Sequence, residues 1–236
     1  MQQPRQYRYF EFVMVAFVVV LVCSNLIGPA KALPDITLPL VGTVVFGAGV
    51  LFFPISYVFG DILTEVYGYS RARRVIWTGF AALMFAAVMA TVIVVLPHNA
   101  AWPNQQAYEI AFGNTWRVAL ASMFAYFCGE FVNSYVLAKM KIWTSGRWLW
   151  TRTIGSTVAG EAVDSALFYP LAFYGSGLMP DALVFKLMVG QFVGKVAVEV
   201  VFTPVTYAIV GFLKRAERED YYDRDTDFNP FKIEAR

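Results

Sequence analysis

The sequence predicts an all-α membrane protein with six transmembrane helices. Of its 236 residues 58% are apolar and only 15% charged, whereas a typical soluble domain carries about 25% charged residues. Long, nearly uncharged runs recur along the chain, and Lys and Arg gather in alternate connections. Helices long enough to cross a bilayer, with cations on one side, are typical of a polytopic membrane protein. The chain has no basic stripe of the kind that binds nucleic acid.

The runs predict helices at about 10–30, 40–67, 74–96, 117–138, 152–174 and 185–213. Together they form one domain over 1–213, followed by a charged cytoplasmic tail at 214–236. The cation distribution places both termini in the cytoplasm.

The first run, 12–30, has features of a signal peptide. Arg5 and Arg8 precede it, and an Ala-Lys-Ala sequence at 30–32 imitates a cleavage site. The run nevertheless approaches the ~20 residues that a span needs, which exceeds a signal core. We interpret it as a retained first helix.

The second and third runs flank a basic connection. Pro54 is expected to kink or break the second run, which stays uncharged until Asp61 and ends at Gly68. A basic segment, Arg71 to Arg74, leads into the third run, and 75–96 contains no charge. The third run is therefore the plainest span.

The remaining runs follow the same alternation. The connection 97–116 lacks Lys and Arg, whereas the short connection after the fourth run is strongly basic from Lys139 to Arg152. A Gly-Ser-Gly turn at 175–177 leads to the sixth run, which ends at Lys214 and Arg215. The tail imitates the acid spacing of a calcium loop, but Phe228 stands where that loop needs glycine, so a solvated tail and no metal site are expected.

Six acids lie within the predicted spans, with one cation, Lys195, at comparable depth. An unpaired charge at the membrane centre costs about 2.5–3.5 kcal/mol, so these acids should face a protein interior or a watery cavity. The helix directions place them together near the midplane or in the cytoplasmic half. The six are Asp61, Glu65, Glu130, Glu161, Asp164 and Glu199.

A short motif recurs among these acids. Gly129-Glu130 is followed by Asn133-Ser134, Gly160-Glu161 by Asp164-Ser165, and Gly60-Asp61 by Thr64-Glu65. Each glycine allows two helices to approach closely, and each acid shares a helix face with a second polar residue three or four positions later. The motif predicts a polar site where these helices meet.

Structural roles are an alternative for some of these residues. Lys195 and Glu199 are four residues apart and could form a buried pair that holds the sixth helix in place. Asp61 or Glu65 could instead meet the basic segment Arg71 to Arg74 at the membrane surface. Glu65, Lys195 and Glu199 are therefore candidates for either energy coupling or structural pairing.

The sequence resembles the queuosine precursor transporter family of bacterial inner-membrane proteins over nearly its whole length. The matching motifs are Phe53-Pro54, the run from Tyr57 to Tyr69, Arg71-Ala72-Arg73, the segment Gly129 to Ser134, Gly160-Glu161 with Asp164-Ser165, Thr203-Pro204 with Tyr207, Asp220 to Asp223, and Asn229-Pro230-Phe231. The resemblance implies a multi-pass inner-membrane carrier that imports 7-deazaguanine precursors, the 7-cyano form (preQ0) or the 7-aminomethyl form (preQ1), for salvage into tRNA queuosine.

This substrate class suits the buried acids. A guanine-like edge offers two parallel N–H donors that one carboxylate can accept, and aromatic rings could sandwich the flat heterocycle. We expect Glu130, Glu161 or Asp164 to bind the guanine edge. The candidate substrate-binding residues are Asn25, Tyr57, Asp61, Glu130, Asn133, Glu161, Asp164, Ser165 and Gln191.

Other readings stay open at this point. The chain could be a membrane subunit that binds substrate and needs a separate ATPase, or could carry another nucleobase-like or vitamin-like heterocycle. An enzyme is disfavoured because no predicted span holds a histidine and no nucleophile elbow occurs; no cofactor is expected. Proton symport and facilitated diffusion are both compatible with the acids, and the glycines are compatible with a homodimer.

Overall fold

The computed structural model describes residues 6–26, 36–38, 42–44, 52–113, 116–175 and 180–232. The predicted all-α class is confirmed, with six long helices and one short helix, α4. The elements of these ranges are α1 (Phe10–Leu26), β1 (Ile36–Leu38), β2 (Gly42–Val44), α2 (Phe53–Tyr67), α3 (Tyr69–Val95), α4 (Gln105–Phe112), α5 (Trp116–Trp143), α6 (Leu149–Phe173) and α7 (Asp181–Glu217).

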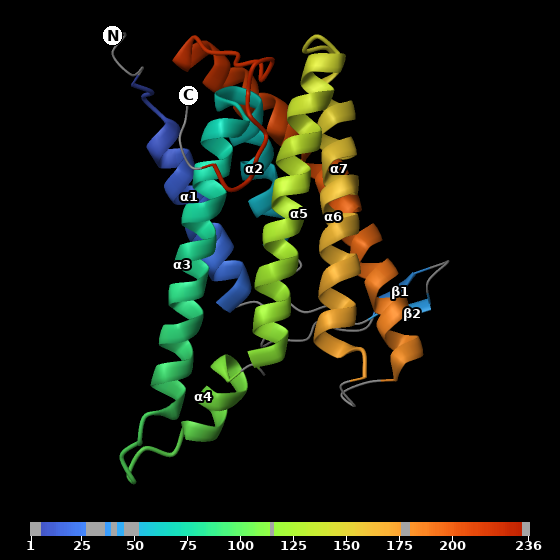
Figure 1. The fold of residues 1–236 in the computed structure, drawn as a ribbon. Coiled ribbons are helices and arrows are strands. Elements are labelled where there is room, and N and C mark those ends of the chain that lie inside the picture. The colour runs from blue at the N-terminus through green and yellow to red at the C-terminus, as the bar shows by residue number, and fades with distance from the viewer. Residues whose placement is uncertain are drawn as a thin grey trace.

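The long helices form a bundle around α2 (Figure 1). α2 contacts α1, α3, α5 and α7, while α6 packs extensively against both α5 and α7. α1 is part of this bundle, because its buried Phe17 and Leu21 belong to the same apolar core as α2 residues. α2, with 15 residues, is therefore enclosed by the longer helices α1, α3, α5 and α7.

The surface of the bundle identifies a membrane protein. Large apolar side chains point outward along α3, α5 and α7, with Phe85 68% and Val201 73% exposed, although water would disfavour such a surface. In the described part of the chain, two helices, Tyr69–Val95 and Leu183–Glu217, are both long and apolar enough to cross a membrane. α5 and α6 are similarly long, with 28 and 25 residues, but carry the polar residues of the site described below.

The second helix differs from the prediction of 40–67. α2 begins at Phe53, with Pro54 in its first turn, where proline needs no amide partner and its fixed φ favours the helix. Pro54 therefore starts the helix and does not kink it. Residues 42–44 form β2, which pairs antiparallel with β1 (Ile36↔Val44); residues 45–51 lie outside the described ranges.

The third helix begins at Tyr69, earlier than predicted, because the distant tail caps it. Both carboxylate oxygens of Asp223 accept the backbone N–H of Tyr69, at 3.0 and 3.1 Å, which satisfies an amide that a helix start leaves free. The predicted break at Gly68 is confirmed. Gly68 has φ +86°, and a side chain there would strike the Tyr221 ring.

The later helices are longer than predicted at their basic ends. α5 continues through Lys141 to Trp143, and α7 continues to Glu217. The connection predicted over Lys139–Arg152 shrinks to 144–148, since Lys141 and Arg152 find acidic partners inside the bundle and need not remain in water. The polar connection after α3 contains α4, whose side chains are exposed or half-buried.

The tail is not the solvated segment that we expected. Arg73 donates to the backbone carbonyl of Asp227 at 2.8 Å, and the Trp77 indole donates to that of Pro230 at 2.9 Å. Phe228 packs on Tyr69 with ring centroids 5.0 Å apart. The acceptors of these hydrogen bonds are backbone carbonyls of the tail. The number of charged residues in the tail, on which the expectation was based, does not predict such contacts. Residues 218–232 therefore lie at the end of the bundle that holds the α2–α3 turn and the α5–α6 connection at 144–148. This end is called the basic end below.

Candidate functional site

Three glycines bring the helices together halfway along the bundle. A Cβ added to Gly160 of α6 would lie 2.8 Å from the Gly129 carbonyl oxygen of α5, and one added to Gly129 would lie 3.0 Å from the Gly160 carbonyl oxygen. Backbones in such close contact leave no room for side chains. Gly60 of α2 likewise gives its side-chain space to the Glu130 carboxylate. The glycine of each recurring motif is thus used for close approach.

The acids that follow these glycines gather at the same level. Glu130 and Glu161 lie near the middle of α5 and α6 and are 0% and 1% exposed. The Cβ of Asp164 is 3.0 Å from the Cβ position at Gly129. Asp61, Glu130, Glu161, Asp164 and Glu199 are called the acidic cluster below.

Two members of the acidic cluster differ in how their oxygens are used. Asp61 accepts a hydrogen bond from the amide of Asn133 at 2.8 Å, and the Ser156 hydroxyl lies 3.5 Å from the same oxygen. Glu130 is fully buried, yet among the residues that the structure describes neither of its carboxylate oxygens has a hydrogen-bond partner. Burying an unpaired carboxylate is costly.

Lys195 of α7 joins the other two acids. Its Nζ lies 2.6 Å from Asp164 Oδ2 and 2.8 Å from Glu161 Oε2. The buried pair of Lys195 with Glu199 that the spacing suggested is therefore wrong for this conformation: within the described part of the chain, neither Glu199 oxygen has a hydrogen-bond partner. The three-residue spacing of Glu161 and Asp164 puts two acids on the face of α6 towards α7, and two acids hold Lys195 better than one.

Glu199 completes the cluster from α7. Its side chain is 0% exposed, and it follows by one helical turn Lys195, which contacts Glu161 and Asp164. Five acids thus share a buried region. Among the described residues, Lys195 is the cation that contacts Glu161 and Asp164 there. Such an excess of carboxylates favours a ligand that is cationic or rich in N–H donors.

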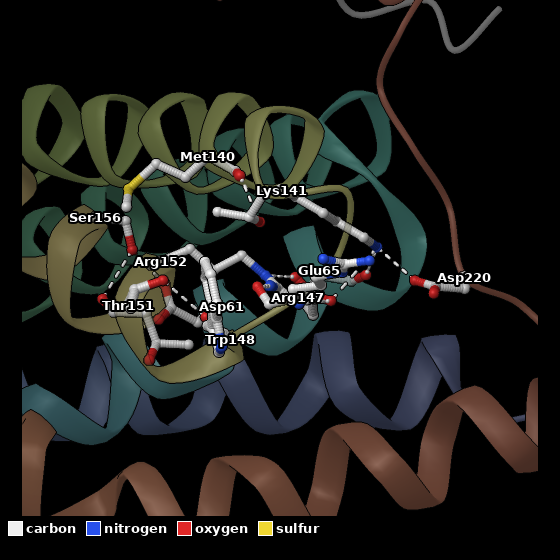
Figure 2. Close-up of polar contacts among 12 residues, drawn as sticks. Asp61, Glu65, Met140, Lys141, Arg147, Trp148, Thr151, Arg152, Ser156 and Asp220 are labelled. Carbon is white, nitrogen blue, oxygen red and sulfur yellow. Dashed lines mark hydrogen bonds and ion pairs between the residues drawn. The ribbon is translucent and has the colours of Figure 1, made fainter.

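Glu65 belongs to a separate network at the basic end (Figure 2). It accepts two hydrogen bonds from the Arg152 guanidinium, at 2.7 and 2.8 Å, and a further one from Lys214. Lys141 lies 3.5 Å from Glu65 and 2.6 Å from Asp220 of the tail. Glu65, Lys141, Arg152, Lys214 and Asp220 are called the basic-end network below.

The basic-end network corrects one expectation and adds residues that we missed. Glu65 meets Arg152 and lysines of α5 and α7, not the segment Arg71 to Arg74, which faces the tail and the N-terminal aromatics. Sequence reasoning treated Lys141, Arg152 and Lys214 only as topology signals. The signal that could have identified them is that each lies within one helical turn of apolar residues, which favours a buried position. Through this network Glu65 of α2 is connected to α5, α6, α7 and the tail.

An apolar cavity of about 380 Å³ lies between α1, α3, α5 and α6, towards the end opposite the basic end. Asn25 and Ser122 line it with Phe168, and the Asn25 and Ser122 side-chain oxygens are 3.3 Å apart. The acidic cluster does not line this cavity, nor the groove of about 980 Å³ between α1 and α3 at the basic end. Asn25 is thus separated from the acids with which we grouped it.

The remaining predicted residues lie around the acidic cluster to different degrees. Tyr57 is buried with its hydroxyl 3.0 Å from the Cβ position at Gly129, and Ser165 is buried beside Asp164. Gln191 is half-buried one turn before Lys195. The aromatic ring of Phe127 on α5 packs on Trp77 and Phe131.

Comparison with known proteins agrees with the motifs. Residues 47–209 match the family described as "Putative vitamin uptake transporter". A "Probable queuosine precursor transporter" of Bacillus subtilis is 30% identical over 209 residues, which cover 88% of this chain and 86% of that protein. The "Queuosine precursor transporter" of Escherichia coli is 28% identical over 168 residues, 69% of this chain and 71% of the relative.

A third relative, from Haemophilus influenzae, is also named "Probable queuosine precursor transporter" and is 27% identical over 54% of this chain and 52% of its own. No solved structure matches the chain. The family consists of transporters and not of enzymes. The chain, a helical membrane protein with its acids gathered between α2, α5, α6 and α7, belongs to the queuosine precursor transporter family.

Proposed function

We propose that this protein imports queuosine precursors, preQ0 or preQ1, across the bacterial inner membrane for salvage into tRNA. The names of the relatives support the substrate class. The basic end, with both the N-terminal residues and the tail on it, would face the cytoplasm, because Lys and Arg concentrate on that side. Tyr7 donates a hydrogen bond to Glu219 at 2.9 Å, so these two residues lie at the same end of the bundle, which supports this orientation.

The observation that carries this proposal is the buried acidic cluster at mid-bundle. A 7-deazaguanine presents an N–H and an adjacent NH₂, two parallel donors that a carboxylate accepts in bidentate fashion. Glu130 is the acid best suited to that edge, because it is buried and neither oxygen forms a hydrogen bond with any residue that the structure describes. Glu161 and Asp164 would complete the site, with Tyr57 placed to contact the ring.

The apolar cavity supplies a route to the acidic cluster. Phe168 of its lining is four residues from Asp164, and Ser122 is eight from Glu130, which is about 6 and 12 Å along a helix. Tyr126, which is fully buried, lies between Ser122 and Glu130 along α5. The flat heterocycle would enter the cavity from outside, and helix movement would then admit it to the acids.

Reconstitution of the purified chain alone in lipid vesicles tests the proposal. We expect uptake of labelled 7-cyano-7-deazaguanine or 7-aminomethyl-7-deazaguanine without ATP, and competition between the two compounds. Uptake that required a separate ATPase would replace this function with that of a substrate-binding subunit. No binding of either compound would reject the substrate class.

The same vesicles distinguish two ways of driving uptake. If uptake stops when the proton gradient is collapsed, the carrier is a proton symporter, with Glu130 and Glu199 as the acids to test for the coupled proton. Uptake that persists identifies facilitated diffusion, in which later enzymes trap the substrate.

A further inference from the structure

Lys195 occupies the carboxylates that a substrate would need. Its Nζ contacts Asp164 and Glu161 at 2.6 and 2.8 Å, so donors of an incoming ligand meet a group already there. A ligand that uses these two acids must therefore displace a protein cation.

The displaced lysine has a destination on its own helix. Glu199 follows Lys195 by four residues, so the two side chains share a face of α7. Both Glu199 oxygens are buried, and no described residue forms a hydrogen bond with them. The flexible four-carbon stem of lysine lets its ammonium group exchange acids without movement of the helix. A role as the acceptor of the displaced ammonium group would explain why the Glu199 carboxylate is buried.

We propose that Lys195 is a tethered cation that competes with the substrate for Glu161 and Asp164 and moves to Glu199 when the substrate binds. The inference rests on the proposed function of the acidic cluster. It adds a specificity-determining residue, because Lys195 stays near the ligand in both positions.

The charge of Lys195 then discriminates between the two precursors. The 7-cyano compound is neutral, whereas the 7-aminomethyl compound carries an ammonium group at neutral pH. Two cations in a buried site repel each other far more strongly than they do in water. Lys195 therefore favours the neutral precursor, and its replacement by an uncharged residue should favour the cationic one.

Equilibrium competition with the purified full-length protein in detergent tests this. Labelled 7-cyano-7-deazaguanine is displaced by unlabelled 7-aminomethyl-7-deazaguanine in wild type, Lys195→Met and the control Lys186→Met, whose lysine is exposed on the same helix. We expect the ratio of the two affinities to shift at least tenfold towards the aminomethyl compound in Lys195→Met only. An unchanged ratio, or the opposite shift, overturns the inference.

Glu199→Gln provides a second test, which decides the matter where Lys195→Met does not yield folded protein. Because the displaced lysine loses its charged destination, both compounds should bind at least fivefold more weakly. Unchanged binding, or weakening of the aminomethyl compound alone, overturns the inference. If wild type binds neither compound, the proposed function fails; if it binds both and the variants behave like wild type, only this inference fails.

Discussion

Neutralising Glu65 should destabilise the protein strongly and leave the substrate site intact. Glu65→Gln removes the charge that Arg152 contacts at 2.7 and 2.8 Å and that Lys214 also contacts. Removing one partner of a buried ion pair costs about 3–5 kcal/mol, because the other charge stays buried. For a chain of this size each kcal/mol lowers the unfolding midpoint by about 2–4 °C. The expected decrease is therefore about 6–20 °C.

Thermal unfolding of the purified protein in detergent measures this effect. Glu11→Gln is the matched control, because Glu11 is exposed on α1 and surface substitutions typically change stability by less than about 0.5 kcal/mol. The dissociation constant for the precursor should remain that of wild type in both variants. A midpoint for Glu65→Gln equal to that of the control refutes the structural role of the basic-end network, and weaker precursor binding at full stability would place Glu65 in the transport machinery.

Three further predictions concern packing and the tail. Gly160→Ala should lower stability by about 1–3 kcal/mol, as overpacking does, whereas Gly211→Ala should not, since nothing lies within 4 Å of its added Cβ; equal unfolding midpoints would contradict this. Asp223→Ala removes the cap of α3 and should cost about 1 kcal/mol with faster proteolysis of the tail; a tail that stays protected would refute the cap. Burial raises the pKa of Asp220, but hydrogen bonds from Lys141 and Lys214 outweigh it and leave that pKa below 3.8. The stabilisation by Asp220 is thus present above pH ~4 and lost on acidification through the folded pKa, so Asp220→Asn should lower the midpoint at pH 7 and flatten its decrease in acid; an unaltered pH profile would contradict this.

The sequence predicted the fold class and the close approach of the helices that carry the acids, because both depend on local patterns. Long apolar runs mark the helices, and the Gly-acid motif predicts close helix contacts and buried acids on three helices. The meeting of Gly60, Gly129 and Gly160 at one level confirms the close approach. The bounds of α2 were wrong because an apolar run has no period that separates a helix from a short strand.

Contacts between distant segments could not be predicted in this way. The early start of α3 depends on Asp223, 154 residues away, and the partners of Lys195 depend on how α6 and α7 are rotated about their axes. The four-residue spacing of Lys195 and Glu199 favoured a pair within the helix. Two carboxylates on α6, however, attract the Lys195 ammonium group more strongly than one carboxylate on α7 does. Local spacing thus identified the participants and not the pairing.

Binding of labelled 7-cyano-7-deazaguanine to Glu130→Gln, Glu161→Gln and Asp164→Asn tests the central claim most directly. The exposed acid Glu109, replaced by Gln in the same way, is the control. If the acidic cluster receives the guanine edge, Glu130→Gln should bind at least tenfold more weakly than wild type, because the replacement presents an N–H where the ligand brings its own. Wild-type affinity in all three variants would show that the precursor binds elsewhere.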